Sequence, residues 1–222
     1  MKDTGSLSFF ANARKSLLKV FRSKYFYLGL LALIMGEQLN FASETYLHEY
    51  MDQGKSLPML SDLILDNLPY MRVSVLYDIF CIFPVAFLII YIFHRGDYNR
   101  IPFFLLMIGI FYMIRGVFIV LTPFGNPPMF EGTESIFRGF SKYELGVYPS
   151  GHAGNVFMIF LLVRDSIYKK LILFCLIVVI MSLFLSRGHY SIDILSGLFF
   201  SYAIKSFGEK HLSAFDLGKH RE

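Results

Sequence analysis

The stretch VSVLYDIFCIFPVAFLIIYIF, residues 73–93, decides the fold class of this chain. It holds 21 residues and a single charge, Asp78. A second stretch, IPFFLLMIGIFYMIRGVFIVL at residues 101–121, is equally long and also holds one charge, Arg115. A helix of about 20 residues, rising about 1.5 Å per residue, crosses a hydrocarbon core of about 30 Å. Two such runs predict an all-α, polytopic membrane protein.

The remaining sequence extends this pattern to six transmembrane helices, which agrees with a hydrophobic content of 55% over 222 residues. The last three predicted spans are short for a full crossing, so either they extend further or the site at their ends is recessed in the membrane. The spans are predicted at residues 25–42, 71–93, 101–121, 151–163, 171–185 and 192–204.

This pattern divides the chain into a basic segment at residues 1–24, a catalytic membrane domain at 25–207 and a polar tail at 208–222. The first ten residues lack the apolar core of a cleavable signal peptide, so we expect no processing. Residues 7–21 mix apolar and basic side chains. They are either an interfacial amphipathic helix or a basic flank that fixes the topology.

Lys and Arg orient the chain, because they accumulate on the cytoplasmic side of membrane proteins. Fifteen of them flank one set of predicted helix ends and five flank the other. This asymmetry predicts two cytoplasmic termini, and it explains the net charge of +4 without a nucleic-acid partner. We expect a multi-pass protein, in a bacterial inner membrane, with its outer connections carrying the five: Lys55, Arg72, Arg138, Lys142 and Arg187.

Two stretches at predicted outer helix ends carry the chemistry: YPSGHAG at residues 148–154 and SRGHYSID at residues 186–193. The start of a helix offers unpaired backbone N–H groups and the positive end of its dipole, which suit a phosphate. Ser150 is able to cap such a helix, and Gly151 would let an anion approach closely. His152 would then project at the mouth of the fourth span.

His189 and Asp193 are four residues apart, so they share a face if that segment is helical. A carboxylate in that position accepts Nδ1–H and leaves Nε2 available as a nucleophile or a base. This pattern makes His189, Asp193 and His152 the candidate catalytic residues.

Arg115 is predicted to lie in the outer half of the membrane, because it is about 21 Å along its helix at 1.5 Å per residue. Glu37 and Asp78 fall at a similar depth by the same rise. Arginine binds phosphate oxygens bidentately, so Arg115 and Arg187 are candidate phosphate ligands with Ser150 and Gly151. The alternative for Arg115 is an internal ion pair with Glu37 or Asp78, which otherwise support the catalytic residues.

PSGH followed by a later His-x-x-x-Asp resembles the signature of the type 2 phosphatidic acid phosphatase (PAP2) superfamily. HYSID, the stretch RGVFIVLTPFGNPP at 115–128 and LPMLSDLILDNLP at 57–69 are similar to its sphingomyelin synthase branch. The resemblance implies that His189 attacks phosphorus, that Asp193 orients it and that His152 protonates the leaving oxygen. It implies a phospholipid or lipid phosphate as substrate and requires no cofactor.

The sequence departs from the phosphatase pattern in two places. That pattern puts five residues between an Arg and the catalytic His, whereas only Gly188 separates Arg187 from His189. The phosphatase Lys that would stand seven residues before Arg115 is replaced by Ile108. The shorter spacing is typical of the synthase branch.

Two other classes of protein remain open on the sequence. Intramembrane Glu, Asp and Arg can line the path of a transporter or channel. His152, His189 and Asp193 could alternatively be the three ligands of a catalytic zinc. A phosphohistidine enzyme works in chelator and is blocked by vanadate, and a zinc hydrolase behaves in the opposite way.

Overall fold

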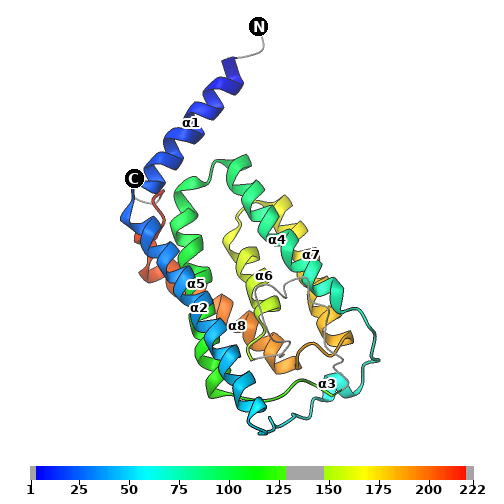
Figure 1. Ribbon diagram of the computed structural model, residues 1–222. Coiled ribbons are helices and arrows are strands. Elements are labelled where there is room, and N and C mark those ends of the chain that lie inside the picture. Colours follow the sequence, from blue (N-terminus) through cyan, green and yellow to red (C-terminus); the bar gives the residue numbers. More distant parts are fainter. Residues whose placement is uncertain (1–3, 129–147, 219–222) are drawn as a thin grey trace.

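A computed structural model describes residues 4–128 and 148–218 of the chain (Figure 1). Every regular element in that part is helical, which confirms the all-α prediction. The elements are α1 (Thr4–Phe21), α2 (Lys24–Asp52), α3 (Leu63–Asp66), α4 (Ser74–Arg95), η1 (Tyr98–Arg100), α5 (Ile101–Leu121), α6 (Gly151–Leu162), α7 (Ser166–Leu185), α8 (Ser191–His211) and η2 (Ser213–Phe215).

A helix lies at each of the six predicted spans, and α5 agrees with its prediction at both ends. Three helical segments are long and apolar enough to cross a membrane: Ser74–Arg95, Tyr98–Leu121 and Ser166–Leu185. α6 is apolar but has only 12 residues. Six crossings and the orientation of the termini therefore stay predictions. Arg138 and Lys142, two of the predicted outer charges, lie outside the described residues.

Three helices are longer than predicted. α2 ends at Asp52 instead of residue 42, and α8 ends at His211 instead of residue 204. α7 begins at Ser166 because Asp165 caps it, accepting hydrogen bonds from the backbone N–H groups of Ile167 and Tyr168. The sequence prediction missed these extensions because it followed apolar runs, and the residues at these ends are polar.

Small residues allow α2 and α5 to pack backbone against backbone. A Cβ atom added at Gly36 would lie 2.4 Å from the carbonyl oxygen of Gly109, and one added at Gly109 would lie 2.5 Å from the backbone of Ala32. No larger side chain fits there, as is common where membrane helices cross closely. The contact fixes the register between the two helices and brings the C-terminal half of α2 alongside Arg115.

The remaining spans complete the bundle around one core. In Figure 1, α6 and α8 lie between the α2–α5 pair and the α4–α7 pair, and α1 extends away from the bundle. α6 is the central helix, since Val156, Met158 and Ile159 on it are buried. Ser201 of α8 donates a hydrogen bond to the carbonyl of Gly154 at 2.7 Å and so joins α8 to α6.

The shortness of α6 places its first residue inside the thickness of the bundle. Its 12 residues rise only about 17 Å, whereas α5 rises about 30 Å. At the far end the two helices are level, because Arg100 donates a hydrogen bond to the carbonyl of Leu162 at 3.0 Å. Arg115, about 21 Å along α5, donates to Pro149, just before α6. The start of α6 is therefore recessed by about 9–13 Å below the end of α5.

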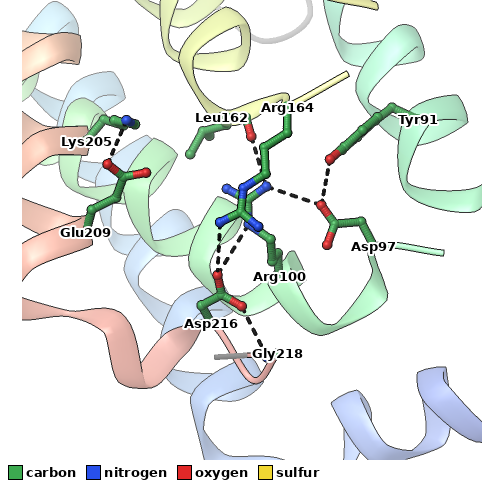
Figure 2. A network of polar contacts seen from close by, with 9 residues as sticks. All are labelled: Tyr91, Asp97, Arg100, Leu162, Arg164, Lys205, Glu209, Asp216 and Gly218. Atoms are coloured by element: carbon green, nitrogen blue, oxygen red, sulfur yellow. Dashed lines mark hydrogen bonds and ion pairs between the residues drawn. The ribbon is translucent and has the colours of Figure 1, made fainter. Parts of the chain in front are cut away.

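The far end of the bundle is closed by a polar network (Figure 2). The carboxylate of Asp216 lies 3.4 Å from Nε of Arg100 and 3.6 Å from Nη2 of Arg164. Arg100 also pairs with Asp97, which accepts a hydrogen bond from the Tyr91 hydroxyl. The polar tail that follows α8 is therefore docked onto the α4–α5 connection and the end of α6.

Candidate active site

The two sequence motifs meet where α6 and α8 begin. The backbone N–H of Ser150 donates to the carbonyl of Asp193 at 3.0 Å. Gly197 makes this approach possible, because a Cβ atom there would lie 2.6 Å from the carbonyl oxygen of Ser150. The hydroxyl of Ser150 accepts from the backbone N–H of Ala153 at 3.3 Å, which confirms the predicted cap. Two helix N-termini thus converge on one recessed point.

His189 and Asp193 lie together, as their spacing predicted. Nδ1 of His189 is 3.1 Å from Oδ2 of Asp193, and the same oxygen accepts the backbone N–H of Tyr190 at 3.0 Å. Both side chains are buried. When Nδ1 carries the proton and donates it to this carboxylate, the lone pair of the imidazole is on Nε2. His189 is thereby held in the tautomer that a nucleophile needs.

Burial lowers the pKa of His189 below the ordinary value of an imidazole. The carboxylate of Asp193 opposes this shift, and the positive charges of His152 and Arg115 add to it. The ring is therefore neutral at neutral pH. The same interactions show that the four charged or titratable groups lie within electrostatic range of one another.

His152 stands opposite His189, with the two ring centroids 5.9 Å apart. Its Nε2 lies 3.4 Å from Oδ1 of Asp78, and its ring packs edge-on against Tyr77 at 4.9 Å. Asp78 is buried in α4. Asp78 thus lies against His152.

Arg115 is tied to two elements at once. Its Nε donates to the carbonyl of Pro149 at 3.0 Å, and its Nη1 donates to Oε1 of Glu44 at 2.9 Å and to the amide oxygen of Asn40. Asn40 also donates to Glu44 at 3.1 Å. The ion-pair alternative named Glu37 or Asp78 as the partner, whereas the ion pair that the structure shows for Arg115 is with Glu44. Glu37 is exposed on α2 and lies within electrostatic range of Arg115.

Sequence reasoning missed Glu44 because it ended the first span at residue 42, and it did not single out Asn40 within that span. Glu44 was then part of a loop, although it lies one helical turn beyond Asn40. The signal was present: two polar side chains four residues apart continue one face of a helix. Together they hold the guanidinium against the turn that precedes α6.

Two of the predicted phosphate ligands adjoin this guanidinium. A Cβ atom at Gly151 would lie 3.0 Å from Nε of Arg115, so the glycine makes room for the arginine as well as for an anion. Contacts to the described residues engage Nε and Nη1 of Arg115. Its Nη2 is the nitrogen left for a further ligand.

Arg187 occupies a left-handed backbone conformation, with φ 57°. Its Nη2 donates to the carbonyl of Leu68 at 3.0 Å, which ties the turn between α7 and α8 to the connection between α2 and α4. Its Nε is buried and has no hydrogen-bond partner among the described residues. The side chain therefore has one structural contact and a buried Nε–H that no described residue accepts.

The α2–α4 connection is also hydrogen-bonded to the segment between α7 and α8 that carries His189, and to the first residue of α8. We name this segment, residues 186–191, the catalytic turn. The sequence did not reveal these contacts. The Tyr190 hydroxyl accepts the backbone N–H of Leu60 at 3.0 Å and donates to the carbonyl of Asn126 at 3.3 Å. Asp62 accepts the backbone N–H of Ser191 at 2.6 Å. Burial alone would raise the pKa of Asp62, but its hydrogen bonds from backbone N–H groups lower it below the ordinary range.

The described residues contain no group of three His, Cys, Asp or Glu side chains placed to hold a metal ion. His152 and His189 each face their own carboxylate instead. The arrangement is two imidazole–carboxylate pairs set across a space beside a guanidinium.

Comparison with protein families bears on the segment that holds these residues. Residues 148–210 match the PAP2 superfamily C-terminal family. The matched PAP2 segment contains α6, α7 and nearly all of α8, and hence His152, His189 and Asp193. It supports the superfamily named from the motifs. No curated protein matches the chain.

Proposed function

We propose that this chain is an integral membrane phosphatase or phosphotransferase that acts on a phospholipid or lipid phosphate through a phosphohistidine on His189. The PAP2 match supports phosphatase-type activity on lipid phosphates. The observation that carries the mechanism is the pair of imidazoles, each with a buried carboxylate, facing one another at 5.9 Å.

In the first step Nε2 of His189 attacks phosphorus while the bond from phosphorus to the leaving oxygen breaks. Protonated His152 gives its proton to that oxygen, so the lipid alcohol departs neutral. Asp193 stabilises the positive charge that develops on His189, through the hydrogen bond at Nδ1.

In the second step the phosphohistidine passes its phosphoryl group to an acceptor hydroxyl. His152, now neutral, takes the proton of the attacking oxygen, and the P–N bond breaks to restore neutral His189. Water as acceptor gives hydrolysis. A lipid alcohol as acceptor gives transfer.

The phosphate is proposed to bind between the start of α6 and Arg115. The N–H of Ser150 is taken by the carbonyl of Asp193, so the backbone N–H groups of Gly151 and His152, with the dipole of α6, favour an anion there. Nη2 of Arg115 supplies a charged donor. The unused Nε of Arg187 is a second candidate donor.

The narrower alternative is a sphingomyelin synthase-like transferase that moves a phosphodiester headgroup from one lipid to another. It is favoured by the short turn in which only Gly188 separates Arg187 from His189. A recessed site also restricts water, which helps a lipid alcohol to compete as acceptor. Both reactions would use the same phosphohistidine.

The deciding experiment offers phosphatidic acid, phosphatidylethanolamine and phosphatidylcholine to the purified protein in vesicles, with and without diacylglycerol or ceramide. Phosphorus and lipid products are followed together, in chelator and with added vanadate. Phosphate release supports hydrolysis, and a new phospholipid that requires the acceptor supports transfer. Solute flux without any phosphorus-containing product would replace the proposal with a transporter.

We also propose that the site faces away from the cytoplasm, as in a bacterial inner-membrane protein with both termini inside. The basis is the asymmetry of Lys and Arg. Ser56 and Ser166 are exposed at opposite ends of the bundle and serve as matched positions for a cysteine. An impermeant thiol reagent on intact cells should label Ser56→Cys and spare Ser166→Cys. The reverse result would invert the orientation.

A further inference from the structure

The connection between α2 and α4 changes character along its length. Residues 53–56, Gln-Gly-Lys-Ser, are exposed and polar. Further along, four apolar side chains are exposed instead, although exposed apolar area in water costs about 25 cal/mol per Å². We name them the apolar rim: Met59 (68% exposed), Leu60 (38%), Leu63 (82%) and Ile64 (50%).

The apolar rim is held in place by the catalytic turn. Leu60 and Asp62 are hydrogen-bonded to Tyr190 and Ser191, and Leu65 between them and α4 is buried to 1% exposure. Further on, the backbone N–H of Met71 donates to the carbonyl of Leu185, the last residue of α7, at 2.8 Å. These hydrogen bonds fix the connection so that the side chains of the apolar rim stay exposed.

These contacts also set the depth of the rim. α7 rises about 29 Å from Ser166, so Leu185 lies close to the edge of a hydrocarbon core of about 30 Å. Ser191 begins α8 beside the start of α6, which is recessed below that edge. Residues 62–71 therefore run from the level of Ser191, which is bound to Asp62, to the level of Leu185, which is bound to Met71. Leu63 directly follows Asp62 and so lies near the deeper of these two levels.

The chain leads from the rim to an exposed apolar face of α4. Met71, Val75 and Leu76 carry exposed apolar side chains from the end of the connection into the first turn of α4. Ile82 and Phe83 extend the same exposed apolar character further along α4. α4 is one of the helices long and apolar enough to cross a membrane.

We infer that the apolar rim is a membrane-contact surface, which inserts Met59, Leu60, Leu63 and Ile64 into the leaflet at the site end of the bundle. Its partner is the acyl-chain and headgroup boundary of that leaflet. Because the rim is hydrogen-bonded to Tyr190 and Ser191, lipid that touches it lies next to His189. This last consequence rests on the proposed function, whereas insertion itself does not.

The chain has no Trp, so a single Trp reports on one position without background. Leu63→Trp is placed in phosphatidylcholine vesicles, with and without bromine on the acyl chains. We expect blue-shifted emission and strong quenching by the brominated lipid. At 82% exposure, Leu63 loses no packing on substitution.

Two matched positions calibrate the measurement. Phe174→Trp, on the exposed face of α7, gives the quenching of a residue in contact with acyl chains. Gln53→Trp, at the end of α2 and in the polar part of the same connection, gives that of a residue in water. Emission and quenching of Leu63→Trp equal to those of Gln53→Trp would overturn the inference. Neither result depends on enzymatic activity.

Discussion

The bundle carries a polar cluster at each end, and the two are built differently. At the far end, Arg100 and Arg164 meet the carboxylate of Asp216, and Arg100 also meets Asp97 (Figure 2). Cations and anions there neutralise one another. At the site end, two carboxylates each hold an imidazole, and the imidazoles face each other.

The difference separates a structural cluster from a chemical one. The charges of a fixed ion pair change little when a proton or a phosphate arrives. Removal of one partner leaves the other charge buried and unpaired. An imidazole held by one nitrogen keeps the other for reaction. Five substitutions test this comparison, ordered by their expected effect on turnover.

His189→Ala should abolish turnover and any phosphoenzyme, because it removes the Nε2 atom that is proposed to form the bond to phosphorus. Phosphate release and acid-quenched labelling measure both. His94→Ala is the matched control: this histidine lies at the other end of α4 and contacts the Tyr168 hydroxyl at 3.0 Å. Comparable turnover in folded His189→Ala protein would refute the assignment.

His152→Ala should lower turnover by about 10²–10⁴-fold, the usual contribution of a general acid. A substrate with a good leaving group needs less protonation, so its loss should be smaller and the phosphoenzyme should persist. Rapid-quench measurement of phosphoenzyme with two leaving groups distinguishes this role. An equal loss for both would assign His152 to positioning alone.

Arg115→Lys should damage turnover nearly as much as Arg115→Ala. An ammonium cannot reproduce the planar fork that reaches Pro149 and Glu44 together and still presents Nη2. Steady-state kinetics and thermal unfolding should be measured on both variants. If lysine restores most of the rate while alanine prevents folding, Arg115 is a tether and does not bind phosphate.

Asp193→Asn should shift the acidic limb of the pH–rate profile to lower pH. Burial already lowers the pKa of His189, so neutral nucleophile persists below the ordinary imidazole range. Asp193 opposes that shift, and its neutralisation lowers the pKa of His189 further. Turnover at the optimum falls as well, since a neutral amide stabilises the positive charge that develops on His189 less than a carboxylate does. A limb that moves to higher pH would contradict the pairing.

Arg100→Ala should leave the turnover of folded protein nearly unchanged, although it destabilises the bundle. Removing one partner of a buried ion pair costs about 3–5 kcal/mol, because the other charge stays buried. Thermal unfolding in detergent should show this loss, with kcat per folded molecule retained. A large fall in kcat without loss of stability would mean that the far cluster takes part in the chemistry.

Much of the fold follows from local composition. The apolar runs at residues 73–93 and 101–121 predicted α4 and α5 within three residues, because an uninterrupted apolar helix needs no tertiary information. The extension of α2 to Asp52 was missed, since its outer end is polar and is stabilised by contact with α5. At α7 the hydrophobicity pattern predicted a start at residue 171, but the cap by Asp165 begins the helix at Ser166.

The site divides in the same way. The sequence by itself determined the pairing of His189 with Asp193 and the cap by Ser150, because both are set by spacing within one helical turn. Only the tertiary structure decided that Asp78 meets His152, that Glu44 and Asn40 hold Arg115, and that Asp62 and Tyr190 strap the α2–α4 connection to the catalytic turn. These contacts join residues from different helices, and which helices adjoin depends on the close approach of Gly36 to Gly109 and of Ser150 to Gly197, which no single stretch of sequence encodes.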